Sequence, residues 1–234
     1  MKDLIEYIDE LEDIMPQRVR AVYIYGSGAR NLNKENLTNL DLVVVVDDLN
    51  GEDIFLCSKA SNKWARKKKN KTPIFLDYEE WMSTADIYPM EYSEMKDCSF
   101  KVRGENILSE LKINKFDLKT QCKQEARKFL MRCRNLYIQT AHLNYDLSNS
   151  LCDLVSLFMV IFRTVLRLSR IEVPKDDREI IFIVCELAKL APEQFIYSLH
   201  CKNTNCKLAK NKAVVLLSEL HDETTKLLEY IEQL

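Results

Sequence analysis

Apolar residues recur along the chain with two different spacings, and the spacing changes near residue 113. Before that point, short runs rich in β-branched and aromatic residues alternate with helical stretches. After it the spacing is helical throughout, and no glycine follows Gly104. The pattern predicts an α+β domain over residues 1–113 and an all-α, up-and-down helical bundle over residues 114–234.

The first domain is predicted to contain helices and strands in alternation. The helices are expected over residues 3–15, 52–69 and 78–82, and the strands over residues 18–25, 40–46, 72–77 and 86–95. In the last of these strands Pro89 is tolerated only because it lies near the beginning.

In the second domain, the segment over residues 146–168 is almost entirely apolar, but charged residues interrupt it too often for a membrane span. It is predicted to form the centre of the bundle or the seam of a dimer. We expect a homodimer through this helix or the last one.

The first strand stops abruptly at Gly26-Ser27-Gly28. The chain has only four glycines, and two of them lie in this turn, which indicates a need for backbone freedom or for close approach to another group. The second strand is a near-continuous apolar run that Asp41 interrupts near its start. A carboxylate on a buried strand requires a compensating group, so a cation or a hydrogen-bond donor is expected near Asp41.

These residues resemble the signature of the nucleotidyltransferase superfamily related to DNA polymerase beta. That signature is an apolar strand, Gly-Ser, about a dozen residues, and then Asp-x-Asp on the next strand. Here the match is Gly26-Ser27 followed by Asn39-Leu40-Asp41, so asparagine stands where the family has its first aspartate. The order of the segments PIFLDYEEW, DIYPMEY and KVRGENIL also resembles bacterial nucleotidyltransferase-domain proteins that carry a C-terminal helical bundle.

The resemblance implies a mixed β-sheet and a site for a nucleoside triphosphate with magnesium or manganese. Gly26, Ser27, Arg30 and Asn39 would bind the substrate, and Asp41, Asn39 and Glu91 would hold the metal. Asp41 and Glu91 would be the catalytic carboxylates, with Asp77 as the competitor of Glu91 for the third acidic position. Because Asn39 contributes no charge, the metal is expected to bind weakly.

Two functions therefore remain open. The first is an enzyme that transfers a nucleoside monophosphate from a metal-bound triphosphate to an acceptor, which the sequence does not identify. The second is a catalytically inactive nucleotidyltransferase fold that binds a nucleotide or a partner protein. Asn39 favours the second function, and the retained turn with Asp41 favours the first.

Overall charge adds little to this picture. A net charge of −2 and a pI near 6.0 give no general attraction to nucleic acid or to an anionic membrane. The acidic N-terminus does not look like a signal peptide or a membrane span, so a cytoplasmic protein without membrane partners is expected. The basic run over residues 63–71 is either a solvated face or, with Trp64 as a stacking surface, a site for nucleic acid or polyphosphate.

The eight cysteines include no CxxC pair, and most are predicted to be reduced thiols in the core. His200, Cys201 and Cys206 lie close together in a polar segment. They are either a zinc site of nonstandard spacing or incidental thiols in a loop.

Overall fold

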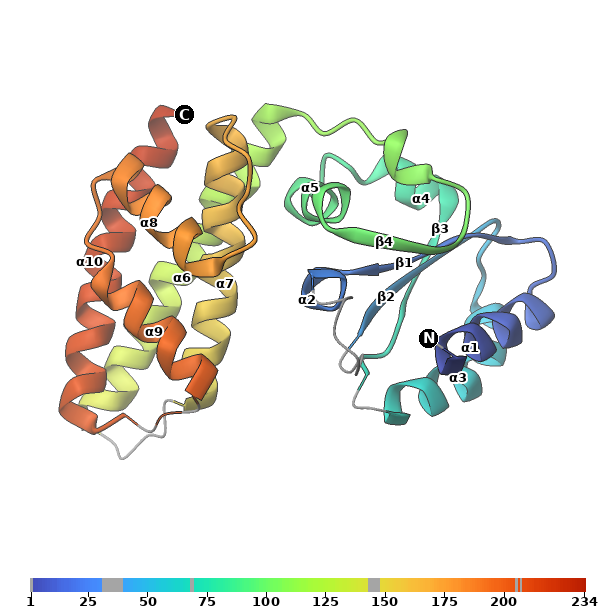
Figure 1. The fold of residues 1–234 in the computed structure, drawn as a ribbon, viewed down its shortest axis with the longest axis horizontal. Helices are drawn as coiled ribbons and strands as arrows, with labels where there is room; N and C mark the ends of the chain where they lie inside the picture. Colours follow the sequence, from blue (N-terminus) through green and yellow to red (C-terminus); the bar gives the residue numbers. More distant parts are fainter. Residues whose placement is uncertain (1, 31–39, 68–69, 143–147, 205, 207) are drawn as a thin grey trace. The chain divides into compact units, whose positions relative to one another are not determined.

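The structure is a computed structural model that describes residues 2–30, 40–67, 70–142, 148–204, 206 and 208–234. The chain divides into two compact units, Met1–Asn114 and Lys115–Leu234. Figure 1 shows both units as a ribbon coloured along the sequence from the N-terminus to the C-terminus.

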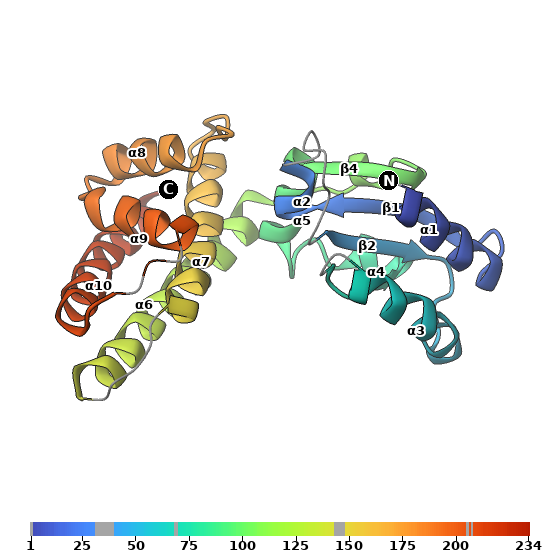
Figure 2. The ribbon, with the colours of Figure 1, turned by 60° about the horizontal axis from the view of Figure 1, so that its bottom comes forward.

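The first unit is built on a four-stranded sheet in the order β3-β2-β1-β4. The strands are β1 (Val19–Tyr25), β2 (Asp41–Val46), β3 (Ile74–Asp77) and β4 (Ser99–Gly104). β1 lies between β2 and β4 (Figure 2) and is antiparallel to both. β2 and β3 are parallel. The predicted mixed sheet is therefore confirmed.

All six residues of β2 are buried, because helices cover both faces of the sheet. α1 (Lys2–Ile14) and α3 (Gly51–Arg66) pack on the face that includes Val44 and Val46. α4 (Tyr78–Ser83), α5 (Pro89–Asp97) and the short 3-10 helix η2 (Ile107–Ser109) cover the face that includes Val43 and Val45. Burying one valine side chain contributes about 1.5–3 kcal/mol, so this strand is a main source of stability for the unit.

The segment over residues 86–95 was predicted as a third main strand, and that prediction is wrong. It forms α5 instead, with Pro89 in the first turn, where the fixed φ of proline suits a helix and its missing N–H leaves no bond unmade. The Ser93 hydroxyl donates to the carbonyl oxygen of Pro89 at 2.7 Å, one helical turn back. The strand that closes the sheet is β4, which begins only after the helix has ended.

The second unit consists of helices throughout the part of it that is described. They are α6 (Lys115–His142), α7 (Ser148–Leu168), α8 (Asp177–Ala188), α9 (Glu193–Thr204) and α10 (Lys210–Gln233). α7 packs against α6, α8 and α9, and its Phe158 and Phe162 meet Phe195 of α9 at ring-centroid distances of 5.2 and 5.0 Å. The predicted fold class, an α+β domain followed by a helical bundle, is confirmed.

The apolar side of α7 faces into this unit. Leu154, Phe158, Phe162 and Leu166 are at most 1% exposed within a single chain. Of the two roles predicted for this helix, the structure therefore supports the centre of the bundle. The homodimer stays a prediction, and its contact area would have to come from other residues.

Candidate functional site

Asp41 is the first residue of β2 and lies opposite Tyr25, the last residue of β1. Asp41 is only 8% exposed, so its carboxylate requires a compensating partner. The beginning of β2 and the end of β1 thus define one edge of the sheet as the candidate site.

Lys71 supplies the compensating cation that the sequence predicted near Asp41. Its Nζ lies 2.7 Å from Oδ1 of Asp41, and its own side chain is 62% exposed. The chain reaches this position just before β3, where the backbone N–H of Lys71 donates to the carbonyl oxygen of Leu40 at 3.2 Å. The ion pair therefore joins a buried carboxylate to an ammonium group at the surface.

The two turn glycines serve different purposes. Gly26 has a φ of +63°, a conformation that glycine adopts without the strain of a side chain, and it opens the short helix α2 (Gly26–Arg30). A methyl group on Gly26 would lie 3.5 Å from Oδ2 of Asp41. A methyl group on Gly28 would lie 3.0 Å from Cδ2 of Leu40, so Gly28 provides close packing. The turn is thus fitted directly against the start of β2.

α5 contributes two carboxylates near this edge. Glu91 and Glu94 are three residues apart on the helix and therefore share one side of it. Arg30 of α2 forms an ion pair with Glu94, which is only 8% exposed. Arg30, a predicted substrate-binding residue, thus links the turn to α5.

Asp41 and Glu91 both lie close enough to Tyr25 to affect its ionisation. The pKa of Tyr25 is raised to about 12, mainly because the phenol is buried and also because the negative charges of Asp41 and Glu91 disfavour its ionisation. The phenol is therefore protonated at neutral pH. Tyr25 is a further polar group of the site, which the sequence argument did not single out.

Asp77, the competitor of Glu91, lies elsewhere. It pairs with Val46, at the opposite end of β2 from Asp41 and roughly 16 Å away at the usual rise per strand residue. Its carboxylate accepts hydrogen bonds from the backbone N–H groups of Leu49 and Glu79 at 3.0 and 2.9 Å, which lowers its pKa. Asp77 caps α4 and is not part of the site.

Asn39 lies outside the described residues, as does the side chain of Ser27. Among the residues that are described, no three Asp, Glu, His or Cys side chains cluster closely enough to hold a metal ion. Among the described residues at the start of β2, Asp41 provides the only carboxylate, and it already forms an ion pair with Lys71. This donor set fits one weakly held divalent ion and does not fit a pair of them.

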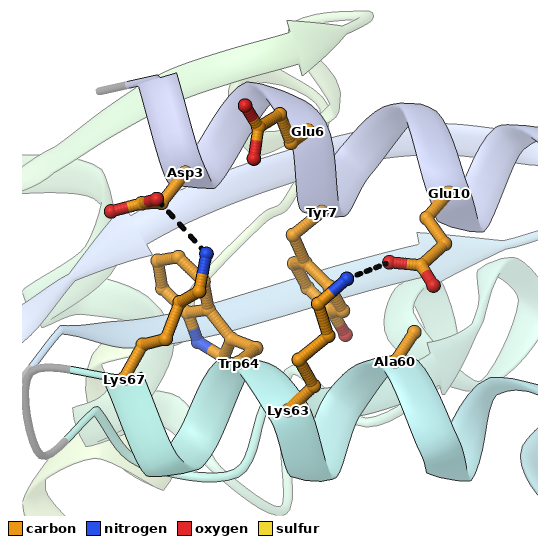
Figure 3. A pocket seen from close by; sticks show the side chains of 8 residues that line it. All are labelled: Asp3, Glu6, Tyr7, Glu10, Ala60, Lys63, Trp64 and Lys67. Atoms are coloured by element: carbon orange, nitrogen blue, oxygen red, sulfur yellow. Dashed lines mark hydrogen bonds and ion pairs between the residues drawn. The ribbon is translucent and has the colours of Figure 1, made fainter.

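The basic run was considered as a nucleic-acid site with Trp64 as a stacking surface, and the structure contradicts that role for Trp64. Trp64 is 4% exposed and stacks on Tyr7 of α1, with ring centroids 5.4 Å apart. Lys67 and Lys63 line a pocket beside it and pair with Asp3 and Glu10 at 3.0 and 3.6 Å (Figure 3). Because α1 is acidic, these lysines serve to attach α3 to α1.

The cysteine prediction is also wrong for one pair. Cys201 and Cys206 form a disulfide, so their thiols are not available as zinc ligands. Cys57, Cys122, Cys133 and Cys185 are free and buried, as predicted for core thiols.

Besides Tyr25, sequence reasoning missed Lys71 and Glu94 as site residues. Lys71 was counted as part of a basic run, although it lies just before the strand that pairs with β2. Glu94 was assigned to a strand, and a helical interpretation would have placed it one turn from Glu91. Both signals were present in the sequence, but each depended on an element boundary.

The turn after β1 and the acid at the start of β2 lie on a mixed sheet, the arrangement that the resemblance to nucleotidyltransferases predicted. The likeness extends to the spectinomycin adenyltransferase AAD(9) from Enterococcus faecialis, whose crystal structure contains ATP and spectinomycin. The two chains are 14% identical and superpose with a TM-score of 0.59, over 96% of this chain and 98% of the other. At this level of identity the likeness shows the fold, and it spans both units.

No protein-family model and no curated protein sequence matches the chain. Of the helices in the described ranges, none is both long and apolar enough to cross a membrane.

Proposed function

We propose that the chain binds a nucleoside triphosphate at the edge of the sheet formed by Tyr25 and Asp41. It transfers the nucleoside monophosphate to a hydroxyl group of a small molecule, and the bond between the α- and β-phosphates breaks to release pyrophosphate. The observation that carries this proposal is the buried carboxylate of Asp41, held directly against the Gly26 turn. A fold shared over nearly its full length with an enzyme solved with ATP and spectinomycin supports ATP as the donor and a small hydroxylated acceptor.

In this proposal each predicted residue has a separate role. Gly26 and Ser27 provide backbone N–H groups and a hydroxyl for the phosphates. Arg30 adds a cation beside them, and its pairing with Glu94 fixes its position. Asp41 and Glu91 are the catalytic carboxylates, and the protonated phenol of Tyr25 lies close to both.

A single magnesium or manganese ion would be held weakly by Asp41, with Asn39 and Glu91 as further oxygen ligands. When bound, such an ion would neutralise charge on the triphosphate. The residues of this chain orient the phosphates and exclude water from the buried side of Asp41.

A second candidate function is a nucleotide-binding module without turnover. Two features favour it: asparagine at position 39, and the engagement of Asp41 by Lys71. Both reduce the negative charge available to metal ions. The two candidates share a binding site and differ in whether a product is formed.

Calorimetric titration of ATP in the presence of Mn²⁺ tests the binding site. The wild type is expected to bind, and Asp41→Asn is expected to lose at least about tenfold in affinity, as is typical when a close charged contact is removed. Asp13→Asn is the matched control, because Asp13 is an exposed carboxylate on α1, on a different element. Failure of the wild type to bind any of the four nucleoside triphosphates would refute the proposal.

Turnover then separates the two candidate functions. Radiolabelled ATP is incubated with a panel of hydroxylated small molecules, and the transfer of label is followed for the wild type and for Asn39→Asp. Labelled product from the wild type establishes the enzyme. Binding without product in the wild type, with product from Asn39→Asp, identifies a module that lacks only a carboxylate at position 39.

A further inference from the structure

The backbone around Lys71 is fixed on the start of β2 by two polar contacts. Lys71 donates its N–H to the carbonyl oxygen of Leu40, and the N–H of Leu40 donates to Oδ1 of Asn70, each at 3.2 Å. Asn70 is 8% exposed, and its Nδ2 donates to the carbonyl oxygen of Trp64 at 3.4 Å. Lys71 therefore lies beside Asp41 because its neighbours are anchored there.

The carboxylate of Asp41 has two different neighbours. Oδ1 contacts the ammonium of Lys71, whereas Oδ2 faces the backbone of Gly26. Since Asp41 is buried and Lys71 is largely exposed, the lysine side chain forms the solvent side of this arrangement.

We propose that Lys71 is an internal cation that competes with a divalent metal ion for Asp41. An ammonium group and a divalent ion on the same carboxylate repel each other, so the ion binds only after Lys71 has moved away. Its exposed four-carbon side chain is able to move into solvent without unpacking the core. The proposal concerns the metal ion of the proposed function, but it is testable without any nucleotide.

The other described lysines of the basic run differ from Lys71 in this respect. Lys63 and Lys67 pair with Glu10 and Asp3 on α1, on the side of α3 that carries the pocket of Figure 3. Lys67→Met removes the same charge from the same segment without changing the partner of Asp41. It is therefore a matched control for Lys71→Met.

The experiment is a titration of the protein with Mn²⁺ alone, in which free ion is measured by its electron paramagnetic resonance signal. Lys71→Met is expected to bind Mn²⁺ about tenfold more tightly than the wild type, a modest effect because the lysine is exposed and solvent screens its charge. Lys67→Met is expected to bind as the wild type does. The double variant Lys71→Met/Asp41→Asn is expected to lose the gain, since it lacks the shared carboxylate.

An Mn²⁺ affinity of Lys71→Met equal to that of the wild type would overturn the proposed competition. An equal gain in Mn²⁺ affinity in Lys67→Met would also overturn it, because it would indicate a general effect of charge. A gain that survives in the double variant would place the ion away from Asp41 and would also overturn it. The proposed function fails by a separate result, the failure of the wild type to bind any of the four nucleoside triphosphates. The two failures are therefore distinguishable.

Discussion

Replacing Gly26 with alanine tests whether the turn at the candidate site depends on a left-handed backbone. At a φ of +63° a side chain costs about 1–2 kcal/mol. The added methyl group would lie 3.5 Å from Oδ2 of Asp41, an ordinary contact, so no clash adds to this cost. Alanine also restricts the unfolded chain, which recovers about 0.4–1 kcal/mol. The expected net loss in the free energy of unfolding is about 1 kcal/mol.

Urea unfolding followed by tryptophan fluorescence measures this loss for the first unit, which contains Gly26. The chain has two tryptophans, Trp64 and Trp81, and both are buried in the first unit, so the signal reports on that unit alone. Gly51→Ala is the control, because a methyl group at the start of α3 meets nothing within 4 Å. It is expected to be neutral or stabilising by up to about 1 kcal/mol. A Gly26→Ala protein as stable as the wild type, or one destabilised by more than about 3 kcal/mol, would refute the reasoning.

Two further predictions concern ionisation. Asp41→Asn is expected to lower the pKa of Tyr25 from about 12 while leaving it above 10, because burial is the larger cause of the shift. NMR titration of ring-labelled tyrosine, with the Tyr25 signal assigned from Tyr25→Phe, measures this pKa. An unchanged pKa would mean that Asp41 and Tyr25 are too far apart to interact. Arg18 lowers the pKa of Asp53 through paired hydrogen bonds of 3.0 and 2.6 Å. The stability that this pair contributes is therefore present above the pKa of 3.8 that Asp53 has in the unfolded chain, and it is lost as the pH falls through the lower pKa of the folded protein. At pH 7 the urea midpoint of Asp53→Asn is therefore expected to be lower than that of the wild type. Between pH 4 and pH 2 it is expected to fall less than the midpoint of the wild type. An equal fall of the urea midpoint in the two proteins would contradict a stabilising Arg18–Asp53 pair.

The sheet was predictable from the sequence where the local pattern and the tertiary environment agree. The buried run after Asp41 is apolar at every position, so its identity as a central strand did not depend on context. The requirement for a cation near Asp41 followed from the same burial. The identity of that cation did not, because Lys71 is distant in sequence and is brought close by the parallel pairing of β2 and β3.

The segment that became α5 shows the limit of such reasoning. Met90, Tyr92 and Glu94 lie at every second position, as the residues on one face of a strand would. All three are buried on a helix, but so are two of their neighbours, Ser93 and Met95. Alternation over a few residues does not separate the two structures when nearly every side chain is covered. Pro89 was the better signal, since proline favours the first turn of a helix and weakens a strand.

The opposite ends of β2 allow stability and chemistry to be engineered separately. Arg18, Asp53 and Asp77 form their hydrogen bonds around the end of β2 at Val46, whereas Asp41 begins the strand at the other end. Stabilising substitutions made near Val46 would leave the carboxylate and its lysine untouched. That end is therefore the place to build a more robust protein for screening acceptor libraries.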